Sequence, residues 1–145
     1  MAVKKIGNIE RVLISECVKD IPSFAKIKRL FDMGADPNAV NDIGECVLGI
    51  ILEGYCSLYG ANLRSGFFVP MLIETFAENG FNVRRHGLKV ISELQNGCYD
   101  KYMRRAIKMI LKARRECLRQ DINTVCRCVK TAAAKFTDKI KPQAA

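Results

Sequence analysis

Apolar residues recur at helical spacing along most of this chain, and the alternating patterns typical of strands are scarce. Residues 22–33, for example, place Ile27, Leu30 and Phe31 on one side of a helix. Similar apolar faces recur throughout, so we expect an all-α protein. The expected helices cover residues 9–19, 22–33, 45–56, 67–79, 87–96, 101–119 and 121–138.

A short polar connection after the second expected helix carries glycine and proline at informative places. Gly34 suits a helix C-terminus, because glycine takes positive φ without steric cost. Pro37 cannot continue the helix. Asn41 and Asp42 favour a turn through side-chain bonds to their own backbone, and Gly44 permits a second tight turn. The segment should therefore project two turns outward and start another helix.

The same context recurs further along the chain. Gly80 follows an apolar helix as Gly34 does, and Gly87 is placed as a second turn glycine, like Gly44. The two glycine pairs predict two connections of similar geometry, each between antiparallel helices.

The run from Gly34 to Ala39, with the Asp42–Gly44 turn after it, resembles the junction between two ankyrin repeats, and the match is best over residues 25–50. The interval between the glycine pairs exceeds the family period of about 33 residues. We therefore expect an insertion without helical period around residues 57–66. Of the family's Thr-Pro-Leu-His element, only Leu48 agrees. A generic stack of helical hairpins is the alternative fold.

The length suits one domain, and the resemblance implies that it is a short solenoid of antiparallel helical hairpins. We expect the domain to span residues 1–138, since 145 residues are typical of a single compact unit. The first helix and the last would cap the array, because a solenoid needs ends that close its core. The expected hairpins cover 9–33, 45–79 and 87–119, the capping helix covers 121–138, and a frayed tail covers 139–145.

The excess of positive charge is confined to the C-terminal part of the chain. The formal net charge is +9, although acidic residues slightly outnumber basic ones in the first eighty residues. In the helix expected at 101–119, six basic residues recur at steps of four and three, which places them on one face. This basic stripe consists of Lys101, Arg105, Lys108, Lys112, Arg115 and Arg119. We expect it to contact an acidic protein surface or a phosphate backbone; the alternative is a solvated helix face.

The ankyrin resemblance implies a second contact region at the turn tips, over Asp36–Asp42 and Asn82–His86. The tip residues expected to meet a protein partner are Asp36, Asn38, Asn41, Asp42, Arg84 and Arg85.

Few residues of the sequence are candidates for catalysis. His86 could act as a general base or metal ligand, but its neighbours favour a turn residue whose pKa is depressed by the adjacent arginines. Cys126 and Cys128 could be half of a metal or redox site, yet no second pair stands at suitable spacing. We expect one buried and one partly exposed thiol there. No segment fits a phosphate-binding loop. We therefore expect no catalysis, no cofactor and no metal.

The cysteine count and the hydropathy pattern bear on the compartment. Seven cysteines without an apolar secretion signal predict reduced thiols, most of them small core residues, in a cytoplasmic protein. No apolar stretch is long enough to span a bilayer.

The expected function is that of a non-enzymatic, ankyrin-like module that binds a protein partner. One alternative is a helical protein that binds nucleic acid through the basic C-terminal half. Another is a regulatory domain of a larger protein.

Overall fold

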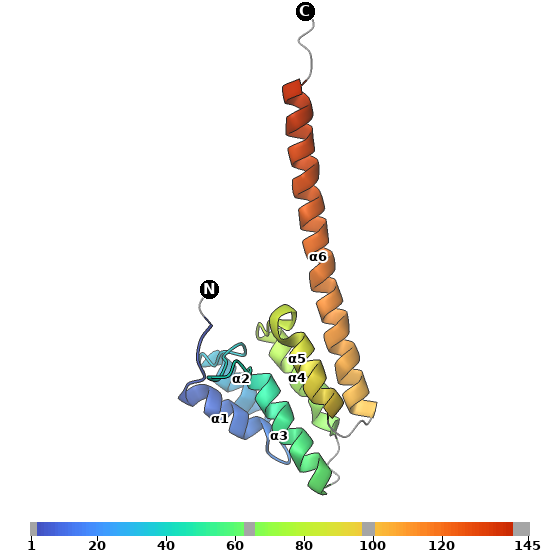
Figure 1. The fold of residues 1–145 in the computed structure, drawn as a ribbon. Helices are drawn as coiled ribbons and strands as arrows, with labels where there is room; N and C mark the ends of the chain where they lie inside the picture. The colour runs from blue at the N-terminus through green and yellow to red at the C-terminus, as the bar shows by residue number, and fades with distance from the viewer. Residues whose placement is uncertain (1–2, 63–65, 97–100, 141–145) are drawn as a thin grey trace, which may run out of the picture.

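The computed structural model describes residues 3–62, 66–96 and 101–140, without the side chains of residues 55–62, 66, 96 and 135–140. Over this part of the chain it is all-helical, which confirms the predicted fold class (Figure 1). The elements are α1 (Asn8–Cys17), α2 (Phe24–Asp32), α3 (Val47–Asn62), the 3-10 helix η1 (Gly66–Phe68), α4 (Val69–Glu78), α5 (Val83–Asn96) and α6 (Lys101–Ile140).

The helices form a packed body from which one long helix projects. Helix α3 lies between α1 and α5, while α4 and α5 both pack against the first part of α6. Figure 1 shows α6 continuing well past the other helices. We refer to α1–α5 with α6 up to Cys117 as the body, and to the remainder of α6 as the projecting segment.

The core of the body is built from the apolar helix faces that the sequence predicts. Phe76 is fully buried and meets the ring of Phe31 edge-on, with the ring centroids 5.1 Å apart. Helix α3 is apolar on nearly every side and contributes Leu48, Ile51 and Leu52, all fully buried. Its position between α1 and α5 explains that composition, because a helix covered on two sides has no face that must be polar.

Gly34 and Gly80 confirm the predicted helix ends. Their φ values are 103° and 90°, and each follows the last residues of a helix, α2 and α4 respectively. The next residue in each turn donates its N–H back into the helix: Ala35 to the Leu30 carbonyl and Phe81 to the Phe76 carbonyl, both at 3.0 Å. These bonds satisfy carbonyls that a helix C-terminus leaves unpaired.

The prediction that Gly87 occupies a turn is wrong, because Gly87 lies inside α5. Asn82 starts this helix earlier than expected, since its Oδ1 accepts the N–H of Arg85 at 3.0 Å. A Cβ at Gly87 would stand 3.4 Å from Ile110 Cγ2. The glycine therefore permits close approach of α5 to α6, a role that sequence context alone does not separate from a turn.

The expected break near residue 120 is also absent. Helix α6 is continuous, so no separate capping helix covers 121–138, and residues 139 and 140 belong to α6. The rest of the tail, 141–145, lies outside the described residues. No glycine or proline interrupts residues 101–140, and without such a breaker the helix continues.

Other boundaries shift by a few residues. Helix α3 extends to Asn62, so most of the expected non-helical insertion is helical. Gly7 is the N-cap of α1, and its N–H donates to Glu10 Oε1 at 3.1 Å. Ser23 caps α2 by accepting the N–H of Lys26, which leaves Pro22 outside the helix.

Candidate interaction surfaces

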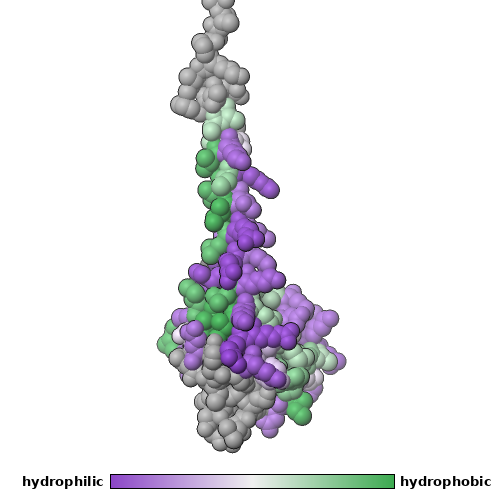
Figure 2. Space-filling view, turned by 90° about the vertical axis from the view of Figure 1, so that its right-hand side faces the viewer, coloured by the Kyte–Doolittle hydropathy of each residue, from purple (hydrophilic) through white to green (hydrophobic). Residues whose placement is uncertain are grey.

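The basic stripe lies on the outer face of α6. All six of its residues are exposed. The opposite face of the same helix buries Met103, Ala106, Ile107 and Ile110 against the body. Figure 2 shows a hydrophilic band along α6 beside an apolar one. The core contacts therefore fix which way the cations point.

The stripe is a run of cations with few anions beside it; on the same helix Glu116 stands four residues after Lys112. In the part of the chain that the structure describes, none of the six residues forms an ion pair. Lys101 Nζ lies 5.0 Å from the centroid of the Tyr102 ring. Like charges at steps of three and four repel one another by a few tenths of a kcal/mol per pair. The stripe is about 27 Å long, at about 1.5 Å of rise per residue.

At the turn tips, Asn38 connects the two glycine turns. Its Nδ2 donates to the Gly80 carbonyl at 2.9 Å, and its Oδ1 accepts the N–H of Asn82 at 2.6 Å. Asp36 Oδ1 in turn accepts the Asn38 N–H at 2.8 Å. Both side chains are half-buried. Their polar groups hold the turns in register, which leaves little of Asn38 for a partner.

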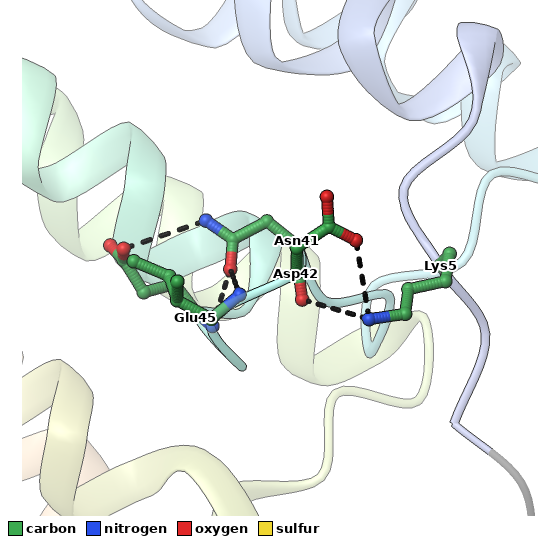
Figure 3. A network of polar contacts seen from close by, with 5 residues as sticks. Lys5, Asn41, Asp42 and Glu45 are labelled. Carbon is green, nitrogen blue, oxygen red and sulfur yellow. Dashed lines mark hydrogen bonds and ion pairs between the residues drawn. The ribbon is translucent and has the colours of Figure 1, made fainter.

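A second polar network braces the next turn against the N-terminal segment (Figure 3). Asn41 Oδ1 accepts two backbone N–H groups, from Ile43 at 3.1 Å and from Glu45 at 2.8 Å. Lys5 Nζ donates to the Asn41 carbonyl and lies 3.4 Å from Asp42 Oδ1. Asn41 thus shapes the turn, whereas the Asp42 carboxylate is fully exposed.

The two arginines at the second tip have different surroundings. Arg84 places one guanidinium nitrogen 2.6 Å from each carboxylate oxygen of Asp121, which ties the start of α5 to α6. The exposed side chain of Arg85 forms no ion pair with the described residues. Of the predicted tip residues, Asp42 and Arg85 leave the most charge accessible to a partner.

His86 is a core residue. It lies in the first turn of α5, not in the connection before it, and its ring centroid is 5.9 Å from that of Phe81. Burial lowers the pKa of the imidazole, and Arg85 and Lys89 lower it further. A neutral, covered imidazole of this kind suits packing better than proton transfer.

The thiols divide between the body and the projecting segment. Cys17 and Cys46 are buried, and burial raises the pKa of both, that of Cys17 to about 12. Cys126 and Cys128 are both exposed, so the expectation of one buried thiol is wrong, because nothing packs on this part of α6 among the described residues. No group of three or more His, Cys, Asp or Glu residues within the described structure could hold a metal ion.

The projecting segment carries an exposed apolar surface, in the region where the sequence predicts a capping helix. Ile122, Val125 and Val129 were expected on the inner face of a separate helix, yet each is about three-fifths exposed. The helical period of these residues identified an apolar face, but not what lies against it.

Two searches bear on how the chain is classified. Among the described helices, none combines the length and apolar character needed to cross a bilayer. Comparison of the chain with protein-family models, curated proteins and solved structures found no match.

Proposed function

We propose that this chain is a non-enzymatic protein-interaction module that binds an acidic partner through the basic stripe of α6. The supporting observation is a row of six exposed cations, none paired within the described structure, on one face of a single helix. The stripe concentrates positive charge at fixed intervals, and a complementary acidic surface would relieve its self-repulsion.

We also propose that the helices of the body stack as an ankyrin-like array. Two features support this arrangement: the positive-φ glycines that end α2 and α4, and the side chain of Asn38, which links the two turns. In such an array the turn tips, with Asp42 and Arg85 outermost, would add to the contact surface beside the basic stripe.

The described histidine and cysteine side chains are poorly placed for catalysis. The single histidine, His86, is buried beside Phe81, and the thiol of Cys17 is buried with a raised pKa. The exposed thiols, Cys126 and Cys128, lie on the projecting segment, away from that histidine. A thiol nucleophile needs a nearby base or a lowered pKa to react efficiently.

Binding of nucleic acid through the same stripe is the second candidate. The net charge of +9 and the length of the stripe favour contact with a phosphate backbone. Aromatic residues are not interleaved with the stripe beyond Tyr102, so stacking on single-stranded bases has little support.

The test is a combined charge reversal, Lys108→Glu with Lys112→Glu and Arg115→Glu. The matched control is Lys26→Glu with Lys28→Glu and Arg29→Glu on exposed positions of α2, which changes the net charge equally. Partners captured by the native chain would be identified by mass spectrometry, purified and titrated at low and high salt. We expect the α6 variant to bind at least about tenfold more weakly at low salt and the control to bind as the native chain does.

Three results would argue against the proposal. Equal affinity of both variants for the purified partner would make the stripe a solvated helix face. Equal loss in both would indicate a general charge effect. Salt-dependent binding of a random-sequence DNA duplex that is lost only in the α6 variant, without a protein partner, would support the nucleic-acid alternative.

A further inference from the structure

The projecting segment is largely exposed in the described structure. From Leu118 to Ala134 every residue is exposed except Asp121, which is partly covered and pairs with Arg84. Isolated helices of this length are marginal in water, because tertiary packing normally supplies most of their stability. Asn123, Thr124 and Thr131 are also weak helix formers. The helix therefore needs a second surface to stabilise it.

An apolar stripe along the projecting segment has the spacing of a coiled-coil seam. Figure 2 shows an apolar band running up this part of α6. The exposed apolar residues follow one another at steps of four, three, four and three, which is a period of 3.5. This apolar stripe consists of Leu118, Ile122, Val125, Val129 and Ala132. A single packed helix face in a globular body has a wider and less regular pattern.

The residue types along the apolar stripe favour a pair of parallel helices. In heptad notation Ile122 and Val129 occupy a, and Leu118, Val125 and Ala132 occupy d. β-Branched residues at a with leucine at d favour two parallel strands, and both a positions and the d position Leu118 follow this preference.

The flanks of the apolar stripe fit a second copy of this chain better than an acidic partner. Between Asp121 and Ala134 the g and e positions beside the seam hold Asp121, Cys126, Cys128 and Ala133, none of them cationic. The cations of this stretch, Arg127 and Lys130, stand at the outer f and b positions. Two copies of a chain with a net charge of +9 can associate only where like charges stay off the seam. An acidic partner would instead be matched by cations on those flanks.

The same logic defines where the seam begins. Arg115 stands at the a position before Leu118, and Arg119 stands at the e position directly after it. In a symmetric pair these arginines would come close to the cations of the second copy and repel them. The uncharged part of the seam therefore begins at Ile122, just beyond the point where α6 leaves the body, and continues toward the C-terminus.

The apolar stripe is placed so that a second helix can lie on it without disturbing the body. It lies roughly 70° around α6 from the face that Met103 and Ile110 bury, and roughly 100° from the basic stripe, at about 3.6 residues per turn. A paired helix would cover neither α4 and α5 nor the basic stripe.

We propose that two copies of this chain associate through the apolar stripe as a parallel two-stranded coiled coil. The two bodies then lie at the same end of the pair, and the two basic stripes are presented together. The seam covers only about two heptads, so the association is reversible, with single and paired chains both populated between about 1 and 300 μM.

The experiment is sedimentation equilibrium of the full chain over that concentration range. We expect the native mass to rise from 16.3 kDa toward twice that value. The variant Ile122→Gln with Val129→Gln should stay at the mass of one chain. The matched control, Thr124→Gln with Thr131→Gln, places the same residues at the same height on exposed c positions and should pair like the native chain.

Orientation is tested by a cross-link. Ala132→Cys, in a chain that also carries Cys126→Ser and Cys128→Ser, should form a disulfide-linked dimer on mild oxidation, because d positions face each other in a parallel pair. In an antiparallel pair centred on Val125, position 132 would lie opposite Leu118 instead. The cross-link also tests the proposal independently of the glutamine variant, should that variant fail to fold.

Four outcomes would overturn the proposal. A native chain that keeps the mass of one chain throughout the range rules out pairing. Dimers in both glutamine variants would place the interface elsewhere. Failure of the Ala132→Cys variant to cross-link while the native chain pairs would exclude the parallel arrangement. A single chain that sediments with phosphatidylserine vesicles would assign the apolar stripe to a membrane surface.

Discussion

Ile27 in the body and Ile122 in the projecting segment belong to the same kind of sequence pattern and end in opposite environments. Each stands on the apolar face of an amphipathic helix, yet Ile27 is fully buried and Ile122 is 62% exposed. The difference is that α2 folds against its neighbours, whereas α6 runs past them. Helical periodicity thus predicts the helix and its apolar face, while burial depends on what the rest of the chain places there.

Charge shows a related contrast, between α1 and the outer face of α6. In the body, Glu16 accepts from Lys19 Nζ at 2.6 Å and from the Ser23 N–H at 3.1 Å, and the hydrogen bond from Lys19 lowers its pKa. The basic stripe has no such partners within the described structure. The carboxylate of Glu16 is thus paired locally, whereas the outer face of α6 presents its cations to solvent.

The largest expected contrast between the two regions is in the cost of truncating an apolar side chain. Phe76→Ala should destabilise the body by about 3–5 kcal/mol, because it removes a fully buried ring that packs against Phe31 and Phe81. Ile122→Ala, compared at about 1 μM where single chains dominate, should leave the body unchanged. Urea unfolding followed by circular dichroism measures both. Similar losses would mean that the projecting segment packs on the body.

A smaller contrast concerns backbone conformation within the body. Gly34→Val should destabilise by about 1–3 kcal/mol, because φ is 103° and a β-branched residue is strained there. No atom crowds the position, so the cost is conformational. Gly49→Ala in α3 should stabilise by about 0.5–1 kcal/mol, since the added Cβ meets Cys46 Sγ at an ordinary 3.5 Å. Thermal unfolding measures the stability of both variants. If Gly34→Val is as stable as the native chain, Gly34 has no special backbone role.

The smallest expected effect is a difference in thiol reactivity between the body and the projecting segment. At pH 7.5, iodoacetamide should modify Cys126 and Cys128 in the folded chain and leave Cys17 and Cys46 unmodified until urea unfolds it. Mass spectrometry of peptides after timed alkylation reports the order. Rapid modification of Cys17 at low urea would contradict its burial in a stable core.

The raised pKa of Cys17 adds a pH dependence of known sign. An unfolded chain ionises this thiol near its ordinary value of 9.0, whereas the folded chain holds it protonated to about 12. The unfolded state therefore loses a proton first, and stability falls as the pH rises from about 9 toward 12. Cys17→Ala should reduce that fall, as measured by urea unfolding at pH 8 and pH 10.5.

Much of the fold was predictable because local physics decides it. Gly34 and Gly80 end helices, since few other residues accept positive φ at low cost. The apolar faces of α2, α3 and α4 identified the core. The outward direction of the basic stripe also followed from helical spacing alone, because Met103 and Ile110 occupy the opposite face.

The sequence does not distinguish two tertiary roles that share the same local pattern. Gly87 could end a helix or admit a close neighbour, and only the approach of Ile110 distinguishes them. Asn38 reads equally well as an exposed tip residue or as a link between turns, and its bonds to Gly80 and Asn82 join residues far apart in the chain. The roles of the tips and of the basic stripe in binding a partner stay predictions.

The sequence by itself determined the helical class, the positions of the turn glycines and the face of α6 that carries its cations. Each depends on interactions among residues within a few positions of one another. The tertiary structure alone decided that α6 continues past the body, that Cys126 and Cys128 are exposed, and that Ile122, Val125 and Val129 have no cover within the described chain. The physical reason is that burial is a property of two surfaces, and a periodic pattern specifies only one of them.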